Sequence, residues 1–293
     1  MSLEHAAGPT RIAPHTIWRR HVYVDEVQAF AVPEVGGVLR FLDFGDADGP
    51  ARVYLHGLGF SSASLVHVAA DPTFLPFRSV LVDLLGFGLS DRPETLDYTI
   101  ETHASAVIGL LDELEIRTCE LVGHSLGGSI AIVVASRRPD LVSSLVAAEA
   151  NLTPGIGPFS GRILAMSEES YVKTGFAAGL DELQRAADRD RIAAITLGMQ
   201  RLASPHAMYR TARSLVEERT PTFEELLVAL NVPCWFIVGA KTLEAPERPP
   251  SGEDGDGLEA LGIRRLIVPD AGHLMPLENP HGFVRALGQA VER

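Results

Sequence analysis

The sequence is short of several features that would mark particular classes of protein. Its 25 Lys and Arg residues are outnumbered by 38 Asp and Glu, and the formal net charge is −13. This charge argues against a nucleic-acid partner, which would need a basic surface, and it disfavours binding to an anionic membrane surface. The two cysteines, Cys119 and Cys234, stand in apolar runs, so we expect two small buried residues rather than a disulfide or a redox pair.

Long apolar runs and ligand-binding motifs are also lacking. No run reaches the ~18 apolar residues of a membrane span, and the first 30 residues contain no apolar core of a signal peptide. A cytoplasmic location is the resulting expectation. The ten histidines are scattered, and neither Cys-x-x-Cys nor His-Glu-x-x-His occurs, so we predict no metal site. No Gly-x-Gly-x-x-Gly opens a helix after the first parallel strand, so no cofactor is predicted.

What the sequence does contain is an alternation of strand and helix patterns. Hydrophobic residues make up 46% of the 293 residues, enough for a sizeable core. Apolar residues on consecutive positions, typical of parallel strands covered on both faces, occur at 52–56, 79–83, 119–123, 143–148, 234–239 and 264–269. Helical spacing occurs at 99–116, with Thr99 as the expected N-cap, and at 125–139. Such alternation predicts an α/β fold with right-handed crossovers.

The alternation is interrupted once and is preceded by a different pattern. Residues 1–34 are expected to form an N-terminal arm and a first strand, and the segments 21–32 and 36–45 alternate like antiparallel strands. Residues 150–228 contain helical stretches without a convincing strand, so we predict a helical cap there. The core is then formed by 35–149 and 229–293. Pro, Gly and acidic residues fill 246–257, which predicts a loop.

The strongest functional signal is "LVGHSLGG" at 121–128. It contains Gly-x-Ser-x-Gly around Ser125, follows a predicted strand and opens a predicted helix, which is the context that this motif requires. A sharp turn there holds the serine in a strained backbone conformation, and the helix N-terminus directs N–H groups at its Oγ. Ser125 is the predicted nucleophile; the alternative is a glycine-rich turn without a reactive serine.

Two further segments carry residues that can serve such a nucleophile. "YLHGLGF" at 54–60 ends an earlier strand, and a turn there can aim the N–H of Leu58 at the same point as the N–H of Leu126. Two such donors form an oxyanion hole; the alternative is an ordinary glycine turn. His273 follows the last predicted strand, where it can take the proton of Ser125 as general base. His56 and His124 flank the same place and are interpreted as lining or structural residues.

Four segments resemble, in the right order, members of the α/β-hydrolase-fold superfamily. They are "YLHGLGF", "LVDLLGFGLSDRP" (81–93), "LVGHSLGGSIAIVVA" (121–135) and "AGHLMPLENP" (271–280). The resemblance implies a mostly parallel eight-stranded sheet in the order 1-2-4-3-5-6-7-8, with helices on both faces and a helical cap. It carries Ser125 over as nucleophile, His273 as base, and Leu58 and Leu126 as oxyanion donors. Because the nucleophile is serine, it favours ester-type acyl transfer.

The acid that would orient the histidine departs from the common pattern of this superfamily. It usually follows the seventh strand, but there the sequence reads "GAKTLEAP", with Thr242 at about that place and Glu244 as the first carboxylate. Glu149 instead ends the sixth strand in "SSLVAAEANLTPG", as in zearalenone-lactonase-like members. A carboxylate at the end of a buried run needs a partner. We predict that Glu149 rather than Glu244 is the acid; the alternative is a solvated glutamate.

The sequence thus predicts a serine hydrolase for a small, fairly hydrophobic ester or lactone. Some apolar cap residues, Phe159 and Tyr171 among them, are expected to line the substrate site. Two alternatives stay open: a ligand-binding protein on the same fold with little turnover, and a hydrolase of C–C or amide bonds. The oligomeric state and the specific substrate are not indicated by any motif.

Overall fold

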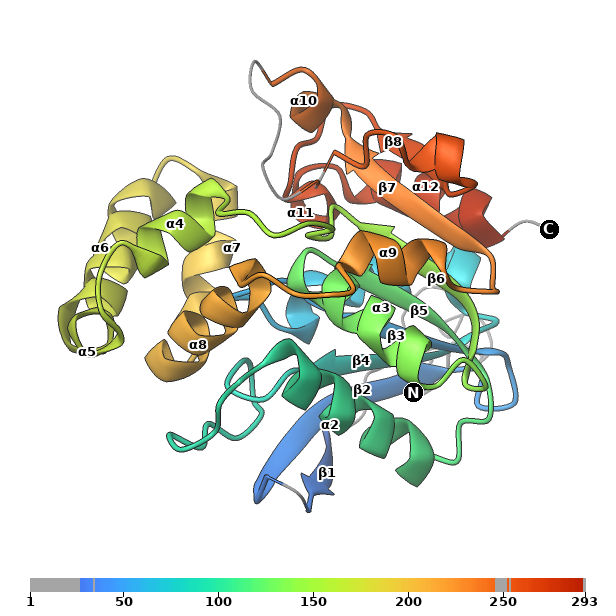
Figure 1. Ribbon diagram of the computed structural model, residues 1–293, viewed down its shortest axis with the longest axis horizontal. Coiled ribbons are helices and arrows are strands. Elements are labelled where there is room, and N and C mark those ends of the chain that lie inside the picture. Colours follow the sequence, from blue (N-terminus) through green and yellow to red (C-terminus); the bar gives the residue numbers. More distant parts are fainter. Residues whose placement is uncertain (1–26, 34, 246–251, 253, 292–293) are drawn as a thin grey trace, which may run out of the picture.

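An eight-stranded sheet runs through the middle of the protein (Figure 1). The structure is a computed structural model that describes residues 27–33, 35–245, 252 and 254–291. Most of the segment 1–34, predicted as an arm and a first strand, and most of the predicted loop at 246–257 lie outside the described residues. The strands are β1 (Gln28–Val32), β2 (Gly37–Gly45), β3 (Ala51–Leu55), β4 (Arg78–Asp83), β5 (Cys119–His124), β6 (Val142–Ala148), β7 (Cys234–Gly239) and β8 (Arg264–Val268).

The strand order is β1-β2-β4-β3-β5-β6-β7-β8, which confirms the predicted α/β fold and topology. β2 pairs antiparallel with β1 and β4, and the remaining neighbours pair in parallel. The central strands are buried along most of their length, as their continuous apolar runs predict. Because β6 lies between β5 and β7, the loops that follow these three strands meet at one edge of the sheet.

Helices cover both faces of the sheet (Figure 1). One face packs against α2 (Ile100–Glu113), α3 (Leu126–Arg137) and α9 (Phe223–Val228), and the other against α1 (Val66–Ala69) and α12 (Pro280–Val291). Thr99 is the N-cap of α2, as predicted, and its hydroxyl accepts a hydrogen bond from the N–H of Thr102 at 3.1 Å. The shorter helical elements are α10 (Ala240–Leu243), α11 (Met275–Glu278) and the 3₁₀ turns Ser62–Ser64, Pro72–Phe74 and Leu258–Leu261.

A buried ion pair joins the two strands that lead to the expected reaction site. Arg52 of β3 is fully buried and stands opposite Glu120 of β5 in the sheet register. Its Nε and Nη2 both donate to Glu120 Oε2, at 2.9 and 2.7 Å. The guanidinium also lies over the ring of Phe77, 3.7 Å from its centroid. The pair therefore ties β3, which precedes Leu58, to β5, which precedes Ser125.

The chain leaves the sheet after β6 and forms a group of helices beside it (Figure 1). These are α4 (Pro158–Leu164), α5 (Glu168–Ser170), a π turn at Tyr171–Gly175, α6 (Phe176–Ala187), α7 (Arg191–Gln200) and α8 (Pro205–Val216). They occupy most of the interval 150–228 for which a cap is predicted. The last helix of that interval, α9, lies apart from them and packs against α3, with Phe223 and Leu227 buried in the main core.

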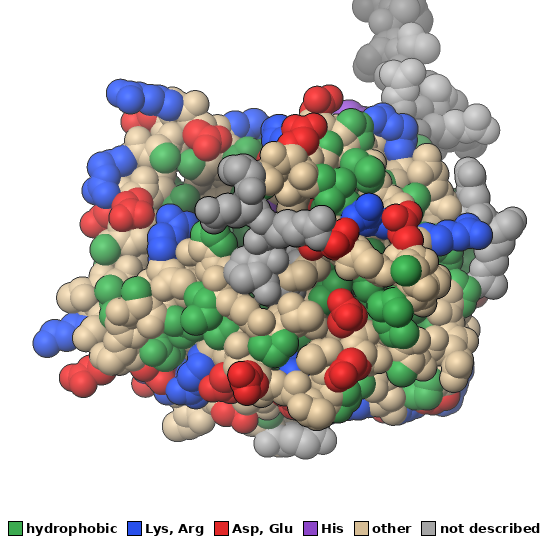
Figure 2. All heavy atoms as spheres, turned by 45° about the horizontal axis from the view of Figure 1, so that its top comes forward, with side chains coloured by type: hydrophobic (Ala, Val, Ile, Leu, Met, Phe, Trp, Pro, Cys, Tyr) green, Lys and Arg blue, Asp and Glu red, His purple; other side chains and the backbone are tan. Residues whose placement is uncertain are grey.

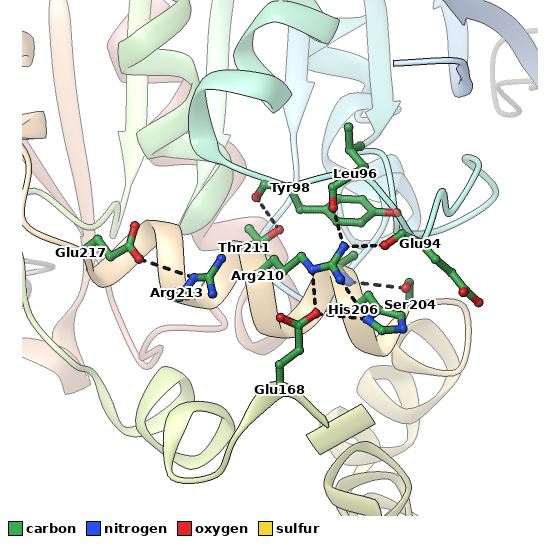
Figure 3. Close-up of polar contacts among 11 residues, drawn as sticks. Glu94, Leu96, Tyr98, Glu168, Ser204, His206, Arg210, Thr211, Arg213 and Glu217 are labelled. Carbon is green, nitrogen blue, oxygen red and sulfur yellow. Dashed lines mark hydrogen bonds and ion pairs between the residues drawn. The ribbon is translucent and has the colours of Figure 1, made fainter. Parts of the chain in front are cut away.

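A charged cluster on α8 fastens the cap to the loop after β4 (Figure 3). Nη1 of Arg210 donates to the carbonyl oxygens of Glu94 and Leu96, at 2.5 and 2.7 Å. Its Nε donates to Glu168 Oε1 of α5 at 2.6 Å, and the same oxygen lies 3.1 Å from Nδ1 of His206. One arginine therefore holds two cap helices and a core loop together, with charge-assisted bonds on each side.

The surface charges, the helix lengths and the two cysteines can be compared with what the composition predicts. Acidic and basic side chains are interspersed on the face shown in Figure 2. Within the described part of the chain, no helix is long and apolar enough to cross a membrane. Cys119 and Cys234 are free and buried, as predicted, and burial raises the pKa of both thiols to about 12.

Candidate active site

Ser125 stands at a sharp turn between β5 and α3. Its φ of 53° and ψ of −122° are unusual for a residue with a side chain, and such strain persists only where the surroundings impose it. The turn needs a small residue at Gly127, because a Cβ there would lie 2.2 Å from the carbonyl oxygen of Leu55. The strand and helix can therefore approach closely, and Ser125 is held 8% exposed at the edge of the sheet.

His273 reaches Ser125 from the loop after β8. Its Nε2 lies 3.0 Å from Ser125 Oγ, and its Nδ1 lies 2.8 Å from Glu149 Oε2. With a neutral imidazole, the Nδ1–H donates to the carboxylate and Nε2 is left to accept from the serine hydroxyl. The sequence prediction that these three residues form one unit thus corresponds to a continuous chain of contacts, the arrangement that a Ser-His-acid triad requires.

Glu149 follows β6 directly, and its side chain is fully buried. Its backbone N–H donates to the carbonyl oxygen of Ile237 on β7 at 2.9 Å, and its φ of 41° ends the extended conformation of β6. Oε1 accepts the N–H of Gly239 at 2.8 Å, while Oε2 faces His273. Both carboxylate oxygens are therefore satisfied, which a buried charge requires.

Glu244, the competing carboxylate, occupies a different environment. It is the C-cap residue of α10, and its side chain is exposed. Among the described contacts, the carboxylate on His273 Nδ1 belongs to Glu149. The end of β7 supplies a backbone donor, Gly239, in place of an acid. The sequence reasoning did not identify this donor, although the adjacency of β6 and β7 that it predicted was the available signal.

The loop after β3 passes directly beside Ser125. A Cβ on Gly57 would lie 3.4 Å from the Cβ of Ser125, so the backbone there is in contact with the turn. Leu58 is 5% exposed, and Leu126 is the first residue of α3. Within the described part of the chain, neither of their N–H groups donates a hydrogen bond to a backbone or side-chain acceptor. Both amides are therefore available to a ligand, as oxyanion donors must be.

His56 directly follows β3, His124 directly precedes Ser125, and both are buried. His56 Nε2 accepts the N–H of Leu84 at 3.0 Å, and its Nδ1 lies 2.8 Å from the carbonyl oxygen of Gly57. Nε2 of His124 donates to the carbonyl oxygen of His273 at 2.7 Å. Burial lowers the pKa of both rings, that of His124 to about 3. Both are thus neutral at pH 7: His56 joins the loop after β3 to Leu84, and His124 joins the end of β5 to the backbone of His273.

The two cap residues predicted to line the substrate site have different surroundings. Tyr171 is 6% exposed and packs against Phe176 and Tyr209, all within the cap. Phe159 on α4 is partly buried against the main core, and the guanidinium of Arg162 lies 5.9 Å from its ring centroid. The described contacts of both residues are packing contacts within the protein, so substrate contact by either one stays a prediction.

Glu278 is a supporting residue that the sequence reasoning missed. Its Oε2 accepts the N–H of Gly272 at 2.9 Å and lies 3.3 Å from Nζ of Lys241. It therefore holds the backbone immediately before His273. Its position five residues after the histidine, on the short helix that follows, was the signal that could have identified it. Within the described residues, no group of three or more His, Cys, Asp or Glu residues gathers in a way that could hold a metal ion.

Comparison with known proteins gives a consistent result. The profile of the alpha/beta hydrolase fold matches residues 52–228. The chain is 31% identical over 194 residues to 2-(acetamidomethylene)succinate hydrolase from Mesorhizobium japonicum, covering 61% of this chain and 67% of the relative. It is 28% identical over 261 residues to an sn-1-specific diacylglycerol lipase of Mus musculus, covering 83% and 81%. The crystal structure of the enol-lactonase from Burkholderia xenovorans superposes with a TM-score of 0.73 at 20% identity, covering 90% and 99%, which shows a shared fold.

Proposed function

The chain belongs to the alpha/beta hydrolase fold family, and from this premise we propose that it is a serine hydrolase that cleaves a carboxylic ester or a lactone through an acyl-enzyme. The observation that carries this proposal is the unbroken chain of contacts from Ser125 Oγ through His273 to Glu149, at 3.0 and 2.8 Å. A lone serine or histidine can have many roles. A strained serine that contacts a histidine, which in turn contacts a buried carboxylate, is an arrangement typical of nucleophilic catalysis.

The reaction follows from the positions of these atoms. His273 Nε2 takes the proton of Ser125 as Oγ attacks the substrate carbonyl carbon, and the carbonyl oxygen becomes an oxyanion. The N–H groups of Leu58 and Leu126 stabilise that oxyanion, and Glu149 stabilises the imidazolium that forms. When the tetrahedral intermediate collapses, Nε2–H protonates the leaving alkoxide. Water then attacks the acyl-enzyme with His273 again as base, releasing the carboxylic acid and restoring Ser125.

The cap interval 150–228 is proposed to shape the substrate site above this machinery, with 35–149 and 229–293 as the catalytic core. The motive is that the chain enters the cap directly after Glu149 and returns to the sheet at β7. The likeness to zearalenone-lactonase-like members, which rests on an acid after the sixth strand, stays a prediction. A lactone would be opened by the same steps, with its ring oxygen as the leaving alkoxide.

The test is turnover of p-nitrophenyl butyrate and covalent labelling with a fluorophosphonate. Ser125→Ala is expected to fold normally, to lose at least about 10³-fold in kcat and to resist labelling. Ser105→Ala serves as the matched control, because Ser105 is an exposed serine on α2. Labelling that persists in Ser125→Ala would show that the nucleophile lies elsewhere. Ligand binding without any Ser125-dependent turnover would favour the alternative of a binding protein.

A second reaction class has support from one relative, which is named for hydrolysis of 2-(acetamidomethylene)succinate. The same nucleophile, base and oxyanion donors serve cleavage of an amide or a C–C bond activated by a carbonyl group. Parallel assays on matched esters, lactones, amides and vinylogous diketones distinguish these classes. A kcat/KM for an amide or diketone above that for every ester would replace the ester proposal.

A further inference from the structure

Helix α7 of the cap lies directly against the loops that carry the reacting groups. Met199 packs in an apolar cluster with Phe60 and Leu277, and Ile192, Ile195 and Leu274 border that cluster. Phe60 stands two residues after Leu58, and Leu274 follows His273. The apolar side of α7 is therefore fixed between the proposed oxyanion loop and the proposed base.

The same helix carries a buried polar side chain beside the oxyanion loop. Gln200 is 6% exposed, and its Cγ lies 3.3 Å from the position that a Cβ on Gly59 would take. Gly59 is the residue directly after Leu58. One helical turn earlier, Thr196 is 8% exposed and lies on the same side of the helix as Gln200.

The hydrogen bonding of these two buried side chains bears on what they can bind. Among the hydrogen bonds of the described residues, none involves the side-chain amide of Gln200 or the hydroxyl of Thr196. Neither group is fully enclosed, because the fully enclosed polar atoms without a partner belong to other residues. An amide that is buried without a partner is costly, and in most structures a protein group or water satisfies it. Here it keeps a small accessible surface next to the proposed oxyanion donor.

We propose that Gln200, assisted by Thr196, determines specificity by hydrogen bonding to a neutral oxygen-bearing group of the substrate, such as a ketone or hydroxyl distant from the scissile carbonyl. The primary amide has both donors and an acceptor, so it matches either kind of oxygen. A neutral partner fits because the adjoining cluster of Phe60, Met199 and Leu277 is apolar, and burying an unpaired charge there is unfavourable. This inference rests on the proposed function and names a feature of its substrate.

The experiment compares matched substrates that differ by one oxygen. In one arm, p-nitrophenyl 5-oxohexanoate is compared with p-nitrophenyl hexanoate, which places the oxygen in the acyl part. In the other, 4-oxopentyl hexanoate is compared with pentyl hexanoate, which places it in the alcohol part. The wild-type protein is expected to prefer the oxo ester by about tenfold in kcat/KM in one arm, the size of a buried neutral hydrogen bond.

The variants assign that preference to the cap. Gln200→Met keeps the length of the side chain and is expected to reduce the preference to within about twofold, mainly by lowering kcat/KM for the oxo ester. Thr196→Val, which is nearly isosteric, should also reduce the preference for the oxo ester, but by less than Gln200→Met does. Gln184→Met is the matched control, because Gln184 is an exposed cap glutamine on α6, and it should leave the preference unchanged.

The outcomes separate this inference from the function on which it rests. Ser125-dependent turnover of the plain esters without an oxo preference in either arm overturns the inference alone. A preference that survives both Gln200→Met and Thr196→Val, or an equal loss on both members of a pair, also overturns it. Absence of any Ser125-dependent turnover overturns the proposed function and the inference together. If Gln200→Met fails to fold, Thr196→Val decides the result.

Discussion

Replacing Glu149 by glutamine removes one oxygen from a group whose two oxygens both face donors. Oε1 accepts the N–H of Gly239 at 2.8 Å and Oε2 faces Nδ1 of His273 at 2.8 Å. A glutamine has one carbonyl oxygen and one NH2, so one of the two donors must face the NH2. If Gly239 keeps the oxygen, the NH2 points at Nδ1. His273 then relieves the conflict by moving its proton to Nε2, the nitrogen that must accept from Ser125.

The size of the expected loss follows from that tautomer. An imidazole protonated on Nε2 cannot act as general base, and a comparable amide substitution in a serine protease triad lowers kcat by about 10⁴. If the glutamine instead turns its oxygen to His273, the tautomer survives but Gly239 loses its acceptor and the imidazolium loses a compensating charge. We therefore expect Glu149→Gln to lose between about 10² and 10⁴ in kcat, with a smaller change in KM.

The assay compares this variant with Glu244→Gln on the same ester at the same pH. Glu244 is exposed at the end of α10, so the control variant should stay within several-fold of the wild type. Circular dichroism and thermal melts establish that both variants are folded. A Glu149→Gln variant that retains more than a tenth of the wild-type kcat, or a larger loss in Glu244→Gln, would refute the assignment of the acid.

Three further predictions concern other parts of the fold. Because the folded protein holds His124 neutral with a pKa of about 3 whereas an unfolded histidine titrates near 6.5, stability should fall as pH drops through that window. The free energy of unfolding, measured with urea between pH 4 and 6, should therefore depend less steeply on pH in His124→Gln, by about 1.4 kcal/mol per pH unit. Arg210→Met, which frees Glu168 and two core carbonyls, should lower the free energy of unfolding by about 1–3 kcal/mol and speed proteolysis of the cap. Glu120→Gln leaves Arg52 buried without its counter-charge and should lower the free energy of unfolding by about 3–5 kcal/mol. The double variant Arg52→Met with Glu120→Leu should leave that free energy nearly unchanged. Equal losses in the single and double variants would contradict this reasoning.

Much of the sheet could be predicted from the sequence because its strands are buried on both faces. The run at 234–239 coincides with β7, and the run at 143–148 differs from β6 by one residue at its start. The helix predicted at 99–116 is shorter, Ile100–Glu113, because Leu114 is its C-cap and Glu115 has a φ of 53°. Apolar periodicity continues past such a point, so it locates a helix better than it locates the end of one.

The cap was less predictable, for a physical reason. Periodicity indicates which side of a helix is apolar but not which element covers that side. The segment 223–228 reads as part of the cap interval, yet α9 packs against α3. Similarly, nothing in the sequence of α7 indicates that Gln200 lies against Gly59 of the loop after β3. Contacts between segments more than a hundred residues apart depend on how the cap is seated on the core.

The position of the proposed acid involves the ends of two neighbouring strands, β6 and β7. A Cβ at Gly239 would lie 2.4 Å from the carbonyl oxygen of Ala271 and 2.7 Å from that of Gly272, so the end of β7 presses against the loop that carries His273. Any side chain at Gly239 itself would push this loop away, and the place where the acid was expected, three residues later, holds Thr242. Because β6 lies beside β7, Glu149 can reach His273 from the adjacent strand while Gly239 contributes only its N–H. The end of β7 therefore provides close backbone packing and an N–H, and the neighbouring end of β6 provides the buried carboxylate that contacts His273.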